Sequence, residues 1–506
     1  MKRIFTLVFA LAVALASNAQ TYVGIQIKTA KQQKITGFGA ASCDGAMKPY
    51  GTDTQPVKLL YGSASKIGLN IMRMEISPSF TGDNWGDYDW QGSTPSAQIV
   101  KLRGGIVFGT PWSPPGEFKT NGTAQGGNSE GQGFLRGQLR EDCYEKFFPW
   151  INTFLDYMKT QGVKVDAVSI QNEPDWWVDY SGCLYTPQQQ VNLVKNYAHL
   201  LDRKKYPYVR LISAEPLGFD PSYSNALLKD ETARDQIDII AGHLYGHPPL
   251  GNMRSSNELA SKYNKEVWMT EHSVSDGIQG RLPNWREQIQ FAQELNECMM
   301  SGCTGYIYWY MRAHWAFVGT GESQYGADNV KNKLLPRAFV MSHFSKYVTG
   351  STRITATPTL YATPQTEAPF ETTAYLKGDS LIVVAIAATD EAYNARLSLP
   401  FAVKSYNHIL STGNETDKLC QETETVLDAP LTKVSISLPA KSVSTIVFMK
   451  DDGMGTDVSS PEAEALRTPP VYYDLQGRRI SQPKGLYIEK HADGTTRKVY
   501  NGAYYD

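Results

Sequence analysis

The chain of 506 residues has little of what marks several large protein classes. Its formal net charge is only −2 and it has no basic run, so we expect neither nucleic acid nor an anionic membrane surface as a partner. After residue 19 no apolar stretch is long enough to span a membrane. The cysteines number six, few for this length, and we expect free thiols rather than a disulfide framework.

Motifs for metal and nucleotide chemistry are also missing. The sequence has no His-Glu-x-x-His pair and no phosphate-binding loop. His243 and His247 have the four-residue spacing of helical metal ligands, but Gly246 lies between them and a Pro-Pro pair follows. A single helix cannot continue through these residues, so we expect no metal site and no cofactor.

The first 19 residues have the pattern of a secretory signal. A charged start, Met1-Lys2-Arg3, is followed by the apolar run 4–16 and by the small residues Ser17-Asn18-Ala19. We expect cleavage near Ala19 and a location in the periplasm, at the cell surface or outside the cell. No cysteine lies near this point to accept a lipid.

From Ile35 onward, short apolar runs alternate with helical patterns. This alternation is typical of repeated βα units and predicts an α/β fold, a (β/α)8 TIM barrel over residues 35–335. An open doubly wound sheet is the alternative, but Gly37, Gly39 and Gly45 are poorly spaced for its phosphate-binding turn. The eight predicted strands are Ile35–Ala41, Leu69–Ser77, Gly105–Pro111, Val165–Asn172, Arg210–Glu215, Asp238–Tyr245, Glu266–Glu271 and Gly305–Tyr310.

The helical pattern stops near residue 333, and the rest of the chain is rich in predicted strands. Residues 336–450 alternate apolar runs with Gly, Asp and Asn turns, which predicts a side β-sandwich domain. Residues 20–34 are also β-rich, and we expect them to pair with that domain. Residues 451–470 form a polar linker, and residues 471–506 form a short strand-rich tail that resembles the C-terminal sorting-type tails of some secreted bacterial proteins.

Two glutamates follow predicted barrel strands in the same way. Glu173 lies in Ser169-Ile-Gln-Asn-Glu-Pro-Asp175, and Glu271 closes the run that starts at Val267. Barrel enzymes place their chemistry at the carboxyl ends of the strands, so both carboxylates should face one cleft. We therefore predict a retaining glycosidase, with Glu173 as acid and base, Glu271 as nucleophile, and carboxyl oxygens roughly 5 Å apart.

Neighbouring strand ends supply candidate supporting residues. Arg73 or Tyr245 would keep Glu271 ionised, and His243 is expected to donate or accept hydrogen bonds at the rim of the barrel. Glu75 and Glu215 also stand at strand ends and are alternative acid/base candidates, although neither follows an asparagine as Glu173 does.

Five motifs occur in order along the chain. They are Gly37-Phe-Gly39, Gly109-Thr-Pro-Trp-Ser-Pro-Pro115, Ser169-Ile-Gln-Asn-Glu-Pro-Asp175, Trp268-Met-Thr-Glu-His272 and Trp309-Tyr-Met-Arg312. Together they resemble family 30 of the glycoside hydrolases, and within it the bacterial xylanase (glucuronoxylanase-like) subfamily. The resemblance implies a barrel with a fused side β-domain and an endo-β-1,4-xylanase acting on xylan or xylo-oligosaccharides. It also implies that Asn172 binds the sugar 2-hydroxyl and that Trp112, Tyr245 and Trp309 line the cleft.

One departure from that group concerns side-group recognition. Its glucuronoxylanases carry two consecutive arginines after the eighth strand, and the second holds the carboxylate of a glucuronic acid side group. The matching residues here are Arg312 and Ala313, and Trp315, also expected at the substrate, stands where a tyrosine is usual. We therefore expect cleavage without strict dependence on glucuronic acid.

Other readings of the sequence stay open. The same family includes β-1,6-glucanases and glucosylceramidases, and either specificity would fit the same two carboxylates. A non-catalytic carbohydrate-binding barrel is the alternative of a different class, although a binding cleft gains nothing from two adjacent buried negative charges. We expect a monomer.

Overall fold

A computed structural model describes most of the chain. The predicted signal segment, residues 1–19, and residues 452–470 of the predicted linker lie outside the described residues, as do Ala313 and Trp315. The described ranges are 21–42, 53–79, 90–127, 136–246, 249–273, 282–312, 316–322, 329–359, 370–451, 471–474, 478–480, 486–490, 496–500 and 503–505.

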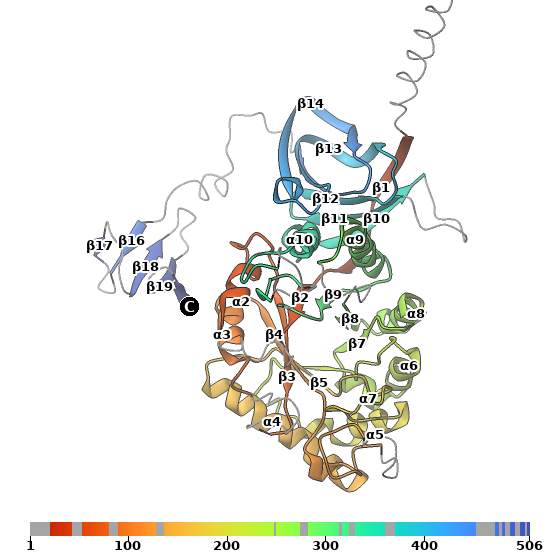
Figure 1. The fold of residues 1–506 in the computed structure, drawn as a ribbon, viewed down its shortest axis with the longest axis vertical. Coiled ribbons are helices and arrows are strands. Elements are labelled where there is room, and N and C mark those ends of the chain that lie inside the picture. The colour runs from red at the N-terminus through yellow and green to blue at the C-terminus, as the bar shows by residue number, and fades with distance from the viewer. Residues whose placement is uncertain are drawn as a thin grey trace, which may run out of the picture.

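Eight short parallel strands form a closed barrel, and they pair in the order in which they occur along the chain (Figure 1). Their burial on both faces explains why they read as continuous apolar runs. The ring closes where β9 pairs with β2, with Gly37 beside Gly305. The predicted (β/α)8 TIM barrel is confirmed. Its strands are β2 (Gly37–Ala41), β3 (Ile71–Ile76), β4 (Ile106–Pro111), β5 (Ala167–Ser169), β6 (Arg210–Ile212), β7 (Ile239–His243), β8 (Glu266–Glu271) and β9 (Gly305–Tyr308).

Helices follow the strands and cover the outside of the barrel (Figure 1). In α4, Phe147, Ile151 and Phe154 are buried at the spacing of one helical face. A capping box formed by Thr186 and Gln189 begins α5. The helices are α2 (Gln55–Leu60), α3 (Thr94–Leu102), α4 (Tyr144–Thr160), α5 (Pro187–Tyr197), α6 (Pro221–Lys229), α7 (Glu231–Gln236), α8 (Pro249–Lys262), α9 (Trp285–Met300) and α10 (Pro336–Val348).

The interior of the barrel is filled by side chains from the strands. Phe108 and Trp268 meet there edge to face, with ring centroids 5.6 Å apart. Ile71, Ile212 and Ile307 belong to the same buried cluster. Because this core blocks the barrel axis, a substrate can reach polar residues only at the end of the barrel.

The side domain is a seven-stranded sheet (Figure 1). The N-terminal strand β1 pairs antiparallel with β10 and parallel with β13. Because β13 shifts register between Ser398 and Val403, it pairs with β1 before the shift and with β15 after it. The predicted strand-rich side domain is confirmed, and its two layers belong to one continuous sheet folded over its own core. The strands are β1 (Thr21–Lys34), β10 (Thr352–Pro358), β11 (Phe370–Lys377), β12 (Ser380–Ala387), β13 (Tyr393–Ser411), β14 (Gln421–Leu438) and β15 (Ser442–Lys450).

The prediction that helical structure ends near residue 333 is wrong, because α10 follows at Pro336–Val348. This last barrel helix packs against β2 and α9 on one side and against β12 and β15 on the other. A helix buried between two domains has no polar face, so the periodicity that identified the other helices is weak here. The predicted boundary at residue 335 therefore falls just before the last barrel helix.

The described parts of the tail form a separate five-stranded antiparallel sheet. Within the described part of the chain, no helix combines the length and the apolar character needed to cross a membrane. The tail strands are β16 (Val471–Tyr473), β17 (Arg479–Ile480), β18 (Leu486–Lys490), β19 (Thr496–Tyr500) and β20 (Ala503–Tyr505).

A buried histidine joins the barrel to the side domain. His343 on α10 shares hydrogen bonds of 2.9 Å with the Thr445 hydroxyl and 2.8 Å with the Ser411 hydroxyl. Burial, with a further contribution from His408, lowers the pKa of His343 to about 3. The imidazole is therefore neutral at ordinary pH and serves as a hydrogen-bonding bridge between the two domains.

This burial predicts acid sensitivity of the junction. The pKa of His343 is about 3 when folded and 6.5 ordinarily, so the unfolded chain binds more protons below pH 6.5. Stability should fall as the pH drops from 6.5 toward 3, by up to ~1.4 kcal/mol per pH unit from this group. In a plot of the urea-unfolding midpoint against pH, His343→Gln should reduce the slope between pH 6.5 and 3. His199→Gln, at an exposed position, should leave this slope unchanged.

Candidate active site

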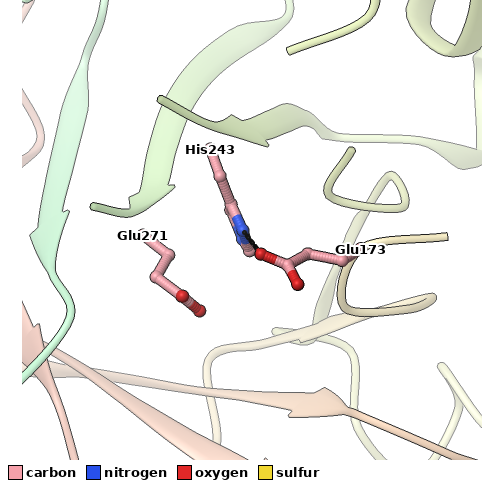
Figure 2. A group of neighbouring side chains, drawn as sticks. All are labelled: Glu173, His243 and Glu271. Atoms are coloured by element: carbon pink, nitrogen blue, oxygen red, sulfur yellow. Dashed lines mark hydrogen bonds and ion pairs between the residues drawn. The ribbon is translucent and has the colours of Figure 1, made fainter. Parts of the chain in front are cut away.

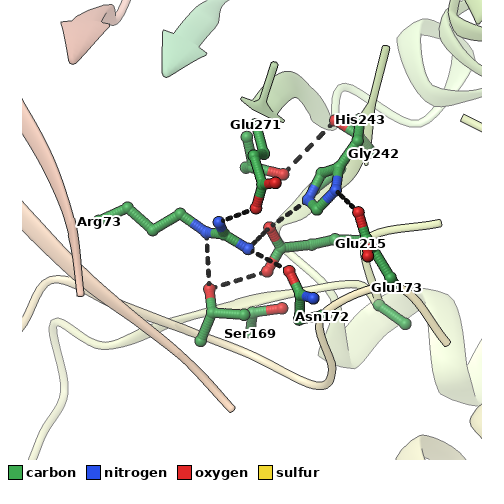
Figure 3. A network of polar contacts seen from close by, with 12 residues as sticks. Arg73, Ser169, Asn172, Glu173, Glu215, Gly242, His243 and Glu271 are labelled. Atoms are coloured by element: carbon green, nitrogen blue, oxygen red, sulfur yellow. Dashed lines mark hydrogen bonds and ion pairs between the residues drawn. The ribbon is translucent and has the colours of Figure 1, made fainter. Parts of the chain in front are cut away.

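Polar side chains converge at the carboxyl ends of the barrel strands (Figure 3). They come from five different strands or from the residues just after them, so the closed barrel brings together residues far apart in the sequence. They are Arg73 on β3, Asn172 and Glu173 after β5, Glu215 after β6, His243 on β7 and Glu271 on β8.

The guanidinium of Arg73 lies at the centre of this cluster. Its Nη1 donates to Glu271 Oε2 at 2.5 Å, and its Nη2 donates to Asn172 Oδ1 at 2.7 Å and to Glu215 Oε2 at 3.0 Å. Arg73 is completely buried, with its guanidinium carbon 4.5 Å from the centre of the Trp112 ring. A planar fork of donors can serve three acceptors in one plane, which a single ammonium cannot do.

A line of alternating charges runs from Arg73 through Glu215 to His243. Burial alone would raise the pKa of Glu215, but Arg73 and His243 outweigh it and lower this pKa to about 2. His243 Nε2 lies 3.3 Å from Glu215 Oε2, and its Nδ1 lies 3.0 Å from Glu173 Oε1. Burial opposes protonation of His243, yet Glu271, Glu173 and Glu215 together raise its pKa to about 9. His243 is therefore an imidazolium at neutral pH and donates from both ring nitrogens.

The two strand-end glutamates face each other across a short gap (Figure 2). Carboxylate oxygens of Glu173 and Glu271 and a ring nitrogen of His243 all lie within 4.8 Å of one another. Burial raises the pKa of Glu271 and the charge of Glu173 adds to this, while His243 and Arg73 oppose it. The Tyr245 hydroxyl donates to Glu271 Oε1 at 3.1 Å. A pair of carboxyl groups this close holds one proton between them more easily than two isolated groups would.

The backbone around Glu173 is strained. Its φ of 41° lies in the left-handed region, which costs a non-glycine residue on the order of 1 kcal/mol or more. The Glu173 amide donates to the Glu215 carbonyl at 2.9 Å, and Asn172 forms an isolated bridge with Glu215. These contacts hold the strained turn in place, so the Glu173 carboxyl points toward Glu271 and His243 (Figure 2).

Glu173, His243 and Glu271 also form the one cluster in the described part of the chain with a geometry that could hold a metal ion. A metal needs a lone pair on a ring nitrogen of His243. Both of these nitrogens lie against carboxylates, and the pKa of about 9 keeps both protonated. The arrangement therefore suits a pair of carboxyl groups that share a proton rather than a metal centre.

Aromatic rings from several strand ends border the carboxylates. Trp112 follows β4 and Trp309 follows β9, and their ring centroids lie 5.8 Å apart. The Tyr245 ring lies 4.9 Å from the ring of His272, which in turn hydrogen-bonds Glu294 at 2.9 Å. Flat apolar faces next to charged groups are the usual surroundings of a sugar ring.

The structure thus gathers eight of the nine predicted site residues in one cluster at the carboxyl ends of the barrel strands. Trp315, the ninth, lies outside the described residues, as does Ala313. Arg312 is completely buried, and its Nη1 pairs with Asp53 Oδ2 at 3.1 Å. The eight are Arg73, Trp112, Asn172, Glu173, His243, Tyr245, Glu271 and Trp309.

Comparison with known proteins gives a consistent answer. A family model described as the glycosyl hydrolase family 30 TIM-barrel domain matches residues 88–318. The glucuronoxylanase XynC of Bacillus subtilis is 25% identical over 450 residues, which cover 87% of this chain and 93% of that protein. The crystal structure of the family 30 subfamily 8 xylanase Xyn30A from Clostridium acetobutylicum superposes with a TM-score of 0.67 at 29% identity and covers 85% of this chain and 99% of its own. Residues 88–318 therefore form a TIM-barrel domain of glycoside hydrolase family 30.

Relatives of this family 30 hydrolase include a second specificity. The endo-1,6-beta-D-glucanase neg1 of Aspergillus fumigatus is 25% identical over 303 residues, which cover 51% of this chain and 60% of that protein. Both kinds of relative are glycoside hydrolases by name, so the comparisons agree on the class of reaction.

Some parts of the hydrolase site were not identified from its sequence. Glu215 was predicted only as an alternative acid, and its full burial between Arg73 and His243 gives it a supporting role instead. Two exposed aromatic residues, Trp176 and Tyr180, lie on the loop after Glu173 and were also missed. The aromatic residues that directly follow the Asn-Glu-Pro motif are the signal that could have found them.

Exchange of Arg73 tests the role of its guanidinium in the hydrolase. Arg73→Lys should lower kcat/KM by about 100-fold or more, because one ammonium cannot hold Asn172, Glu215 and Glu271 together. The control is Arg210→Lys, since Arg210 pairs with Glu266 at 2.5 Å at the opposite end of the barrel. Equal activity of the two variants, with circular dichroism showing both folded, would show that the Arg73 fork is dispensable.

Proposed function

We propose that this family 30 hydrolase is a secreted, retaining endo-β-1,4-xylanase that cleaves xylan without strict dependence on glucuronic acid side groups. The observation that carries the mechanism is the Glu173 and Glu271 pair, whose carboxyl oxygens lie within 4.8 Å across the cleft. Retaining glycosidases have carboxyl groups about 5–5.5 Å apart, whereas inverting enzymes need about 6.5–9.5 Å to admit a water molecule between them.

The first half of the reaction uses both glutamates at once. Glu271 attacks the anomeric carbon and forms a glycosyl ester, while Glu173 gives its proton to the glycosidic oxygen of the departing sugar. Glu271 accepts hydrogen bonds from Arg73 and Tyr245, which favours its anionic form. The retaining mechanism requires the shared proton on Glu173, which can carry it on the oxygen that does not accept from His243.

In the second half, Glu173 acts as the base. Its carboxylate takes a proton from water, the hydroxide attacks the anomeric carbon, and the bond to Glu271 breaks with retention of configuration. Asn172, held by Arg73 at 2.7 Å, lies beside Glu173, and its amide nitrogen can donate to the sugar 2-hydroxyl. The aromatic faces of Trp112 and Trp309 supply apolar contact area for a sugar ring.

The xylan assignment is supported by the Bacillus subtilis and Clostridium acetobutylicum relatives, which carry xylanase names and match nearly their whole length at 25% and 29% identity. The relaxed side-group requirement is supported by Arg312, which is buried and paired with Asp53 and so cannot reach a substrate carboxylate. Ala313, at the position of the second family arginine, has no charge to offer. Secretion is inferred from the signal pattern of residues 1–19.

Substitution of the two glutamates separates their roles. Glu271→Gln should lower activity by about 10,000-fold or more on every substrate, because no glycosyl ester can form. Glu173→Gln should cost about 100-fold or more on xylo-oligosaccharides but much less on dinitrophenyl glycosides, whose leaving group needs no proton. Proton NMR of the first product anomer from the wild-type enzyme should show the β configuration. An α product, or substantial hydrolysis by Glu271→Gln, would contradict the retaining mechanism.

A substrate and product panel tests the specificity. The enzyme should cleave undecorated xylan and glucuronoxylan at rates within about 10-fold, because no arginine binds the side-group carboxylate. Among its glucuronoxylan products, the distance from the glucuronate-bearing sugar to the reducing end should vary. A strictly fixed spacing would contradict the relaxed requirement, and activity confined to β-1,6-glucan or glucosylceramide would contradict the xylan assignment itself.

A further inference from the structure

Two loops at the catalytic end of the barrel are joined by their backbones. The β4 loop comprises the described residues 112–127 and 136–143, and the β5 loop comprises residues 170–186. The Gly126 amide donates to the Tyr180 carbonyl at 2.7 Å, and the Gly182 amide donates to the Ala124 carbonyl at 3.2 Å. The two loops therefore form one wall beside Glu173.

Glycines allow the loops to approach this closely. A Cβ on Gly126 would lie 2.5 Å from the Val178 carbonyl oxygen, and one on Gly127 would lie 2.1 Å from Trp177 Nε1. Each of these distances is below any normal van der Waals contact. The wall is thus tightly packed, and a displacement of one loop must be transmitted to the other.

A buried lysine lies at the centre of the wall. The Lys119 ammonium donates to the carbonyl oxygens of Gly182 at 2.6 Å, Gln125 at 2.7 Å and Ala124 at 3.0 Å. Lys119 is only 2% exposed. Hydrogen bonds from a charged donor are stronger than those from a neutral one, and a buried cation needs such partners to offset its lost hydration. The Gly182 contact crosses between the loops, so the ammonium fixes the β5 loop relative to the β4 loop.

The β5 loop carries the exposed aromatic residues of the cleft. Trp176 is 52% exposed and Tyr180 is 43% exposed, only three and seven residues after Glu173. Burial raises the pKa of Tyr180, and the charges of Glu173 and Glu271 raise it further. Because Glu173 protonates the departing oxygen, side chains on its own loop border the leaving group.

We propose that Lys119 is a positioning residue that holds Tyr180 and the neighbouring part of the β5 loop against the sugars of the leaving group. Lys119 touches no substrate. It acts through the Gly182 carbonyl, two residues from Tyr180, and so governs how well the leaving-group side of an oligosaccharide is bound and aligned for protonation. This inference rests on the proposed function and names which half of the substrate the wall serves.

The test compares two substrates that share the same sugars on the side of Glu271. Xylopentaose has leaving-group sugars, whereas dinitrophenyl β-xylobioside has none and needs no protonation. Lys119→Met keeps the aliphatic chain and removes the ammonium. It should lower kcat/KM for xylopentaose by about 10-fold or more and change kcat/KM for the dinitrophenyl substrate by less than about 3-fold. A displaced β5 loop would impair the binding and protonation of the leaving group, and only xylopentaose depends on these.

Two further variants make the result decisive. Lys101→Met removes an ammonium that contacts Asp166 at 2.7 Å and the Gly105 carbonyl at 2.8 Å near the opposite end of the barrel. For this control variant, the ratio of kcat/KM for xylopentaose to kcat/KM for the dinitrophenyl substrate should stay at the wild-type value. Tyr180→Ala removes a half-exposed side chain with little burden on folding, and should reproduce the selective loss even if Lys119→Met does not fold.

The outcomes separate this inference from the proposed function. The positioning role would be overturned if Lys119→Met lost kcat/KM equally on both substrates, or if Tyr180→Ala left the ratio of the two kcat/KM values unchanged. Failure of the wild-type enzyme to cleave xylopentaose would overturn either the xylan assignment or the relaxed side-group requirement, but not the positioning role. The same comparison would then be made with the oligosaccharide that the enzyme cleaves and with the matching dinitrophenyl glycoside.

Discussion

The Arg73 guanidinium binds side chains that follow three different barrel strands, and each of those contacts is short and buried. A buried cation is tolerated only beside compensating charge, and Glu215 supplies it as a permanent anion with a pKa of about 2. With Arg73 already balanced by Glu215, Glu271 is not required as a fixed counterion. It can lose its charge during a reaction and leave the rest of the cluster in place.

The sequence predicted the barrel because its strands are buried on both faces and end in polar residues, a pattern that local reading can detect. It also paired Glu173 with Glu271. It preferred Glu173 to Glu215 only because Glu173 follows an asparagine, since each is a glutamate before a proline at a strand end. The two glutamates differ in the contacts they make across the barrel. Glu215 pairs with both Arg73 and His243, whereas the ion pair described for Glu173 is with His243.

The features that sequence reasoning missed share a physical origin. Helix α10 is covered by barrel and side domain alike, so its burial gives no one-sided repeat. The closure of the side sheet depends on a register shift within β13, which is a tertiary event without a sequence period. Lys119 reads as an ordinary loop lysine, and only the path of two loops reveals that its ammonium is buried among carbonyl groups. Local patterns predict elements, whereas the supporting contacts arise from how the elements meet.

Charge balance explains why five ionisable residues can share so small a space. In the proposed mechanism one proton lies on Glu173. The cations Arg73 and His243 then balance the anions Glu215 and Glu271, and the cluster is neutral. In the proposed first step Glu271 loses its charge to the glycosyl ester as Glu173 gains one, so the cluster is neutral again. His243 Nδ1 already lies 3.0 Å from the oxygen of Glu173 that receives this charge, and Arg73 keeps Asn172 and Glu215 as partners. The cluster therefore moves negative charge from one glutamate to the other without leaving a net charge buried, which keeps the electrostatic cost of the step low.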